Sequence, residues 1–166
     1  ARHPLIDENT VVPINFELGN SENIMLITGP NTGGKTVTLK VAGLLTLMAL
    51  SGIPIPANEK TEIGHFGSVL ADIGDEQSIE QNLSSFSGHV KKIKEIMEEA
   101  NSSSLVLMDE LGSGTDPMEG AAFAMAIIDY LNGKNIKSII TTHYSEVKAY
   151  AFNTTGIKSA SMEFNV

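Results

Sequence analysis

The sequence predicts an α/β protein in which a mostly parallel sheet is covered by helices on both faces. Short stretches typical of strands alternate with longer helical patterns, and this order gives parallel sheets. One strand-like stretch, 23–28, is a continuous apolar run, which is typical of a strand buried on both faces, and 104–110 predicts another buried strand. A glycine-rich segment follows the first of them and precedes a helical pattern.

The first half of the chain supplies two strands and one helix. Residues 12–18 alternate apolar and polar side chains and predict a half-buried strand, with Pro13 near its start. The apolar strand 23–28 comes next. From Thr36 the chain is apolar nearly all round, which predicts a buried helix that ends at Gly52, where a left-handed cap residue fits.

The second half continues the alternation. Residues 67–74 predict a strand that leads into the polar loop 75–82. A helix is expected next, with Ser84 and Ser85 as candidate N-caps. Its apolar side chains recur every three or four residues, at Phe86, Val90, Ile93, Met97 and Ala100.

Four further elements complete the predicted order. Proline near the first turn and the stop sequence NGKN bound one of the helices. The expected elements are a strand at 104–110, a helix at 117–131, a strand at 137–143 and a short helix at 145–152. The last residues, 156–166, again have the pattern of a strand.

Composition limits the domain count and the kinds of site. The 166 residues, 42% of them hydrophobic, fit one domain spanning 1–166. The absence of cysteine excludes disulfides and thiolate metal sites. The net charge of −9 argues against this surface gripping a phosphodiester backbone, because such binding displaces counterions with Lys and Arg.

No segment has the pattern of a targeting signal or a membrane span. The chain opens without an initiator methionine or a charged-then-apolar leader. Its longest apolar stretch, 41–57, is interrupted by Pro54 and Pro56 and is shorter than the roughly 20 residues that a span needs. We therefore expect a cytoplasmic protein without a membrane partner, and a piece of a longer chain.

Residues 29–36 match the phosphate-binding pattern G-x-x-x-x-G-K-[ST]. Glycines let backbone N–H groups approach phosphate oxygens, and the helix N-terminus adds a positive dipole end. Lys35 would reach the terminal phosphates and the Thr36 hydroxyl would bind Mg²⁺. A chance match in a turn is the alternative, but the position between strand and helix favours a nucleoside triphosphate site. The predicted contacts are Gly29, Pro30, Asn31, Thr32, Gly33, Gly34, Lys35 and Thr36.

Two carboxylates end the strand at 104–110. Asp109 would lie beside the magnesium ion, through water, because Mg²⁺ keeps several waters. Glu110 would orient the attacking water or serve as its base. A strand followed by two acids is common by itself, and the phosphate loop makes the pair informative. At the other acidic strand end, Asp72 and its neighbours are interpreted as loop solvation.

His143 follows two threonines at the end of another buried strand. Ligands gather at such strand ends, so we expect His143 to contact the γ-phosphate. A lone histidine is more often structural, and His3, His65 and His89 are interpreted in that way.

Four segments in this order resemble one family. They are GPNTGGKT, SSFSGHV, LVLMDELGSGTDP and TTHYSE, and they are similar to the ATPase domain of the MutS family, within the ABC-type ATPases. Longer segments of the sequence, such as ADIGDEQSIEQNLSSFSGHV, resemble the type-two branch of this family. The resemblance covers nearly the whole chain. It implies a P-loop NTPase fold, ATP and Mg²⁺ as cofactors, and ATP hydrolysis.

The resemblance also implies a composite site in a homodimer. The signature serine, Ser85 or Ser87, would contact the nucleotide held by the other subunit; simple N-capping is the alternative for both. Residues 112–117 would cross the dimer interface, and His143 would be the histidine switch. Gln77 or Gln81 could be the sensing glutamine.

In that family, other regions carry the remaining activities. Type-two proteins have clamp and core helices before this segment, and dimerisation helices and a nuclease domain after it. None of these patterns occurs in residues 1–166. DNA binding, nuclease activity, control of recombination and action on stalled ribosomes would therefore belong to the parent protein.

The leading hypothesis is an ATP-driven motor domain, in which two copies close over two nucleotides. The alternative is a nucleotide-binding dimerisation module with little turnover. A small-molecule kinase would need an arginine-rich lid, and Arg2 is the only arginine in the sequence.

Overall fold

The chain folds around one five-stranded parallel sheet. The computed structural model describes residues 1–19, 21–30, 33–74 and 85–162, and all of the following concerns those residues. The strands lie in the order β2-β3-β4-β1-β5, and every neighbouring pair is parallel. Their bounds are β1 Ile24–Thr28, β2 Ser68–Asp72, β3 Ser104–Met108, β4 Lys137–Thr141 and β5 Ile157–Ser161.

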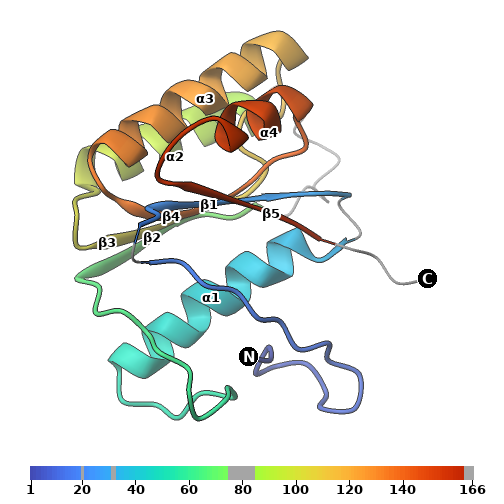
Figure 1. Ribbon diagram of the computed structural model, residues 1–166, viewed down its shortest axis with the longest axis vertical. Coiled ribbons are helices and arrows are strands. Elements are labelled where there is room, and N and C mark those ends of the chain that lie inside the picture. The colour runs from blue at the N-terminus through green and yellow to red at the C-terminus, as the bar shows by residue number, and fades with distance from the viewer. Residues whose placement is uncertain (20, 31–32, 75–84, 163–166) are drawn as a thin grey trace.

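Helices cover both faces of this sheet (Figure 1). One helix, α1, lies against one face, and the other three lie together on the opposite face. Their bounds are α1 Lys35–Leu50, α2 Ser85–Glu99, α3 Pro117–Gly133 and α4 Ser145–Phe152. The predicted α/β class, with a parallel sheet covered on both sides, is therefore confirmed.

Successive side chains of a strand point alternately into two hydrophobic cores, one on each face of the sheet. In β1, Ile24 and Leu26 pack under α2, α3 and α4, whereas Met25 and Ile27 pack against α1. Successive side chains of a strand point to opposite faces, so a strand between two helical layers must be apolar throughout. All five residues of β1 and of β3 are buried, as their continuous apolar composition predicts.

The helix after the glycine-rich segment ends as expected. Its last residue is Leu50, Ser51 is the C-cap, and Gly52 has a left-handed backbone with φ of +74°. No helix among the described ranges is both long and apolar enough to cross a bilayer.

The predicted strand at 12–18 is wrong. These residues form no strand, and Val12 is 80% exposed. Pro13 cannot donate to a ladder, and Ile14 donates its N–H to the Ala1 carbonyl oxygen in the same N-terminal segment. The segment instead runs beside the loop after α1, where Arg2 N–H bonds to the Pro56 carbonyl.

The predicted apolar face of α2 needs one correction. Ile93 and Ile96 are the buried residues, while Val90 and Met97 are only partly covered. Ser85 is the first residue of the helix, and Ser84 lies outside the described residues.

Candidate functional site

The predicted site residues meet at the carboxyl edge of the sheet. The glycine-rich segment follows β1, Asp109 and Glu110 follow β3, and His143 lies shortly after β4. Because β3, β4 and β1 are adjacent parallel strands, their carboxyl ends share one edge, where ligands of open α/β sheets bind.

The segment after β1 turns tightly into α1. Gly34 precedes the helix with φ of +85°, a backbone conformation that favours glycine, and its carbonyl accepts the Thr38 N–H. Lys35 is buried, and its Nζ donates to the Gly29 carbonyl oxygen at 2.7 Å. The lysine ammonium is thus held against the segment that would surround phosphates. Asn31 and Thr32 lie outside the described residues.

Met162 supports this segment from the neighbouring strand. Its N–H donates to the Thr28 carbonyl just beyond β5, which places the residue beside Gly29 and Gly33. A Cβ added to Gly33 would lie 3.1 Å from the Met162 Cβ, a tight contact that would require Met162 to shift by a few tenths of an ångström. The sequence analysis missed Met162, because an isolated methionine after a strand gives no signal.

Hydrogen bonds centred on the buried Asp109 join three elements. Thr36 of α1 donates its hydroxyl to Asp109 Oδ2 at 2.6 Å, and Thr141 of β4 donates to Asp109 Oδ1 at 2.6 Å. The Thr141 hydroxyl also accepts the Glu110 N–H at 2.8 Å. Asp109 is 6% exposed, so these donors offset the cost of burying its carboxylate.

Glu110 has a left-handed backbone, with φ of +48°. A side chain other than glycine is uncommon in this region, at a cost of about 1–3 kcal/mol, and such strain is concentrated at functional sites. The Leu111 N–H donates to the Thr141 carbonyl, so Thr141 holds the backbone on both sides of the turn.

His143 is exposed at this edge, and its ring lies against the buried Tyr144, with ring centroids 4.3 Å apart. The Tyr144 hydroxyl donates to the Gly112 carbonyl at 2.9 Å. Gly112 and Gly120 approach so closely that a Cβ on either would overlap the carbonyl oxygen of the other. Burial raises the pKa of Tyr144, and the nearby negative charges of Asp116 and Glu110 raise it further.

The oxygen donors fit a magnesium ion. A threonine hydroxyl beside a carboxylate oxygen, as at Thr36 and Asp109, offers the hard ligands that Mg²⁺ prefers. Within the described ranges, no group of three or more His, Cys, Asp or Glu could hold a metal ion. Mg²⁺ would therefore be bound through few side chains together with substrate phosphates, as is usual for this ion.

The other predicted residues are less closely grouped. Ser85 begins α2 and Ser87 is exposed in its first turn. Gln77 and Gln81 lie outside the described residues.

Two polar features of this edge escaped the sequence analysis. One is the role of Thr141, which the threonine pair before His143 could have indicated. The other is Asp72, which is the last residue of β2 rather than part of a solvated loop, and which pairs with His89 at 2.9 Å. Its backbone is fixed by strand pairing before the polar stretch begins, so the acidic run misled the interpretation.

Comparison with known proteins gives one family. The sequence matches MutS domain V over residues 25–166. A protein called Endonuclease MutS2 from Fusobacterium nucleatum subsp. nucleatum is 71% identical over 165 residues, which is 99% of this chain and 21% of that protein. Proteins of the same name from Caldanaerobacter subterraneus subsp. tengcongensis and Clostridium botulinum are 59% and 60% identical. The chain therefore spans about a fifth of the length of these relatives.

Replacing Thr141 by valine tests the hydrogen-bond chain. The change keeps the shape but leaves Asp109 with one donor fewer and the Glu110 N–H without its acceptor. We expect the free energy of unfolding to fall by about 1–3 kcal/mol. Urea denaturation measures this loss, with the exposed Thr61→Val as the control. Equal stability of the two variants would show that the hydrogen bonds of Thr141 contribute nothing to the free energy of unfolding.

Replacing Tyr144 by phenylalanine tests its buried hydroxyl. At neutral pH we expect a loss of about 1 kcal/mol, because the Gly112 carbonyl loses its donor. The folded state keeps Tyr144 neutral above the ordinary pKa of 10.0, whereas the unfolded state ionises there. Wild-type stability therefore falls as pH rises above about 10, and the difference between the two proteins narrows.

Denaturation at pH 7 and at about pH 10.5 provides the comparison. The pKa of Tyr150 is also raised, by burial and by its hydrogen bond to Asp129. Both proteins contain Tyr150, so its contribution to the pH dependence cancels in the difference. A constant difference between the two pH values would contradict the assignment.

Proposed function

The chain belongs to the MutS family and is its ATPase domain, and we propose that it binds Mg²⁺·ATP at the carboxyl edge of the sheet and hydrolyses it. The observation that carries this proposal is the chain of hydrogen bonds from Thr36 through Asp109 and Thr141 to the Glu110 backbone. It joins a candidate phosphate loop, a candidate metal ligand and a candidate base in one network.

The residues around the loop would make different contacts with the nucleotide. The backbone N–H groups of residues 29–34 and the N-terminus of α1 would surround the phosphates. The Lys35 ammonium, now 2.7 Å from the Gly29 carbonyl, would donate to phosphate oxygens instead. Thr36 and Asp109 would hold Mg²⁺, which stabilises negative charge on the transferring phosphoryl group.

Glu110 would orient the attacking water and take its proton. Its strained backbone, fixed by Thr141, turns the residue immediately after the metal ligand away from ordinary strand geometry. The same geometry would keep the carboxylate in one position before the nucleotide arrives, which lowers the reorganisation needed at the moment of reaction. His143 would contact the γ-phosphate from the end of β4.

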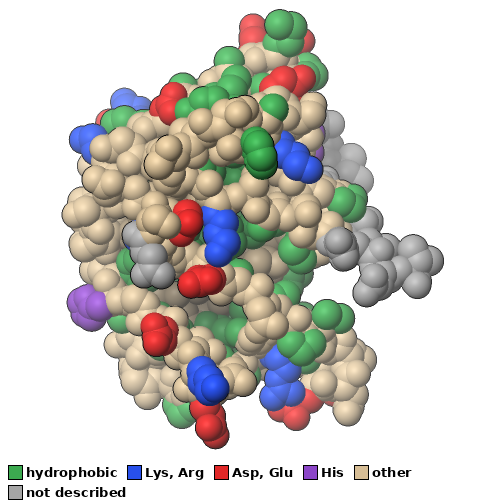
Figure 2. Space-filling model, in the orientation of Figure 1, with side chains coloured by type: hydrophobic (Ala, Val, Ile, Leu, Met, Phe, Trp, Pro, Cys, Tyr) green, Lys and Arg blue, Asp and Glu red, His purple; other side chains and the backbone are tan. Residues whose placement is uncertain are grey.

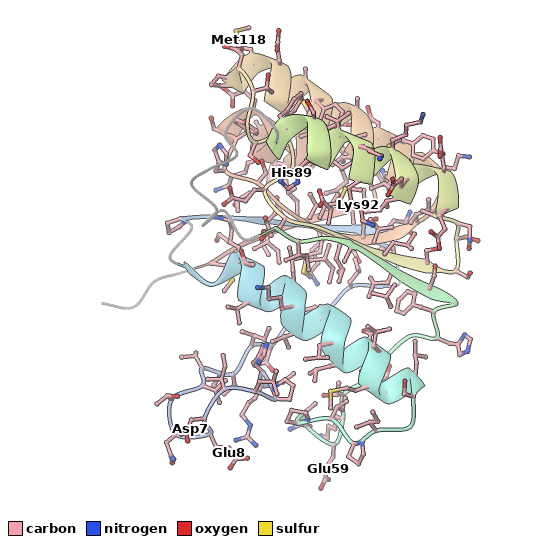
Figure 3. All side chains as sticks on the ribbon, turned by 180° about the vertical axis from the view of Figure 1, so that it is seen from behind. Asp7, Glu8, Glu59, His89, Lys92 and Met118 are labelled. Carbon is pink, nitrogen blue, oxygen red and sulfur yellow. The ribbon has the colours of Figure 1, made fainter. Side chains whose placement is uncertain are left out.

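We propose that the site becomes complete in a homodimer. Residues suited to contact a second copy are exposed: Ser87 in α2, His143 after β4, and Met118 in the first turn of α3. Met118 is 83% exposed and is labelled at the start of α3 in Figure 3. Ser85 or Ser87 would then contact the partner's nucleotide. Hydrolysis would let the two copies separate, and this cycle would move any attached regions.

Any DNA binding or nuclease activity would depend on regions of a longer protein outside residues 1–166. On the face in Figure 2, Lys and Arg side chains are scattered singly among acidic ones. With a net charge of −9, DNA binding and the endonuclease activity that the relatives' name states would require parts of a longer protein. Action on ribosomes would also belong to those parts.

Lys35→Ala tests the phosphate loop. We expect the free energy of ATP binding to weaken by about 1.5–3 kcal/mol, because a charge-assisted hydrogen bond is lost. Titration with a fluorescent ATP analogue measures the Kd, with Lys40→Ala in the same helix as a matched control. Unchanged affinity for Lys35→Ala would refute the assignment of this loop.

Glu110→Gln separates hydrolysis from binding. We expect ATP turnover to fall by at least about 100-fold while the nucleotide Kd changes little, because the amide accepts no proton. Sedimentation of this variant with and without Mg²⁺·ATP then shows whether dimers carry two nucleotides. Equally slow turnover in the variant and the wild type would instead support a nucleotide-binding dimerisation module.

A further inference from the structure

A polar pair outside the proposed ATP site links β2 to the N-terminal end of α2, just after its first turn. Asp72 Oδ2 lies 2.9 Å from His89 Nδ1, and the two residues are 17 positions apart in the sequence. A carboxylate oxygen accepts, so Nδ1 carries the hydrogen and donates. The Asp72 side chain is only 12% exposed, which strengthens the interaction compared with a surface pair.

The backbone of Asp72 binds the strand that carries the proposed catalytic carboxylate. The Asp109 N–H donates to the Asp72 carbonyl oxygen at 2.9 Å. One residue therefore contacts the metal-ligand position through its backbone and α2 through its side chain. Glu110 is the next residue along the chain.

At the start of α2, none of residues 86–90 is fully buried. The buried residues Ile93 and Ile96 lie further along the helix, against the core. Near the start of the helix, Phe86 makes an edge contact with Phe123 and lies beside Gly114, while His89 pairs with Asp72 at the end of β2. Figure 3 shows His89 at the end of α2 nearest the carboxyl edge.

The backbone leaves room for the histidine ring. A Cβ added to Gly74 would lie 3.3 Å from the His89 Cε1, so the residue two positions after Asp72 packs against the ring. The ring is therefore held by a hydrogen bond on one atom and by packing on another.

We propose that Asp72 and His89 are positioning residues that fix the first turn of α2 relative to Asp109 and Glu110. This inference rests on the proposed ATPase function. The first turn contains Ser85 and Ser87, the candidates for contact with a partner's nucleotide. The Asp72–His89 pair couples the hydrolytic edge of one copy to the surface that would complete the site of the other.

Two variants of His89 with similar shapes test the pair in the intact protein. His89→Asn keeps an amide N–H near the position of Nδ1, whereas His89→Leu removes the donor and keeps the same branching at Cγ. We expect kcat to fall about tenfold or more in His89→Leu and to recover substantially in His89→Asn, because small misplacement is costly. The Kd for a fluorescent ATP analogue should stay within about twofold, since the phosphate loop is untouched.

Hydrogen exchange gives a readout that does not depend on turnover. The amides of residues 86–90 should exchange faster in His89→Leu and at the wild-type rate in His89→Asn. Asp72→Asn against Asp72→Leu repeats the comparison from the strand side and serves if one histidine variant does not fold. The exposed His65→Ala is the control and should leave both readouts unchanged.

The outcomes separate this inference from the proposed function. The positioning role is supported if both leucine variants lose kcat and protection from hydrogen exchange, and both asparagine variants recover them. Equal behaviour of Leu and Asn in exchange and turnover overturns it, because the hydrogen bond would then be irrelevant. If wild-type protein hydrolyses no ATP, the proposed function fails, and hydrogen exchange alone still decides whether the pair holds the turn.

Discussion

The buried carboxylate of Asp109 is the constraint on which the site depends. A carboxylate with 6% exposure is costly unless donors surround it, and the donors come from two elements far apart in the sequence. Thr36 contributes from the start of α1 and Thr141 from the end of β4. Satisfying one charge therefore fixes the position of the helix that follows the glycine-rich segment against strands β3 and β4.

The sheet makes this arrangement possible. Parallel pairing in the order β3-β4-β1 places three carboxyl ends side by side, and each strand must bury both faces because helices cover both. The polar side chains of the site therefore lie at the last residue of a strand, as at Thr141 and Asp72, or directly after it, as at Asp109. Backbones also approach closely at this edge, as at Gly29 beside Met162 and at Gly112 beside Gly120, where a Cβ on the glycine would crowd a neighbouring carbonyl oxygen.

The sequence predicted the class, the buried strands, the helix bounds within a few residues, and the segments that meet at the edge. These features depend on local patterns, which the amino-acid order contains. It did not predict that residues 12–18 stay outside the sheet, because alternation does not say whether a partner strand is available. Thr141 and Asp72 were missed for a similar reason: their partners lie over 15 residues away, and the threonine pair before His143 does not by itself say which residue each threonine contacts.

Hydrolysis and subunit contact, both proposed above, would be linked through the start of α2. Glu110 stands between two connections that both lead to the start of α2. On one side, Asp109 binds the Asp72 backbone, and Asp72 binds His89. On the other side, the turn after Glu110 brings Gly114 against Phe86, where a Cβ would lie 3.3 Å from the phenylalanine Cβ. Close packing transmits small shifts rather than absorbing them. A change in the position of Glu110 would therefore reach the start of α2 by two routes, and a surface that contacts a second copy would respond to the state of the nucleotide.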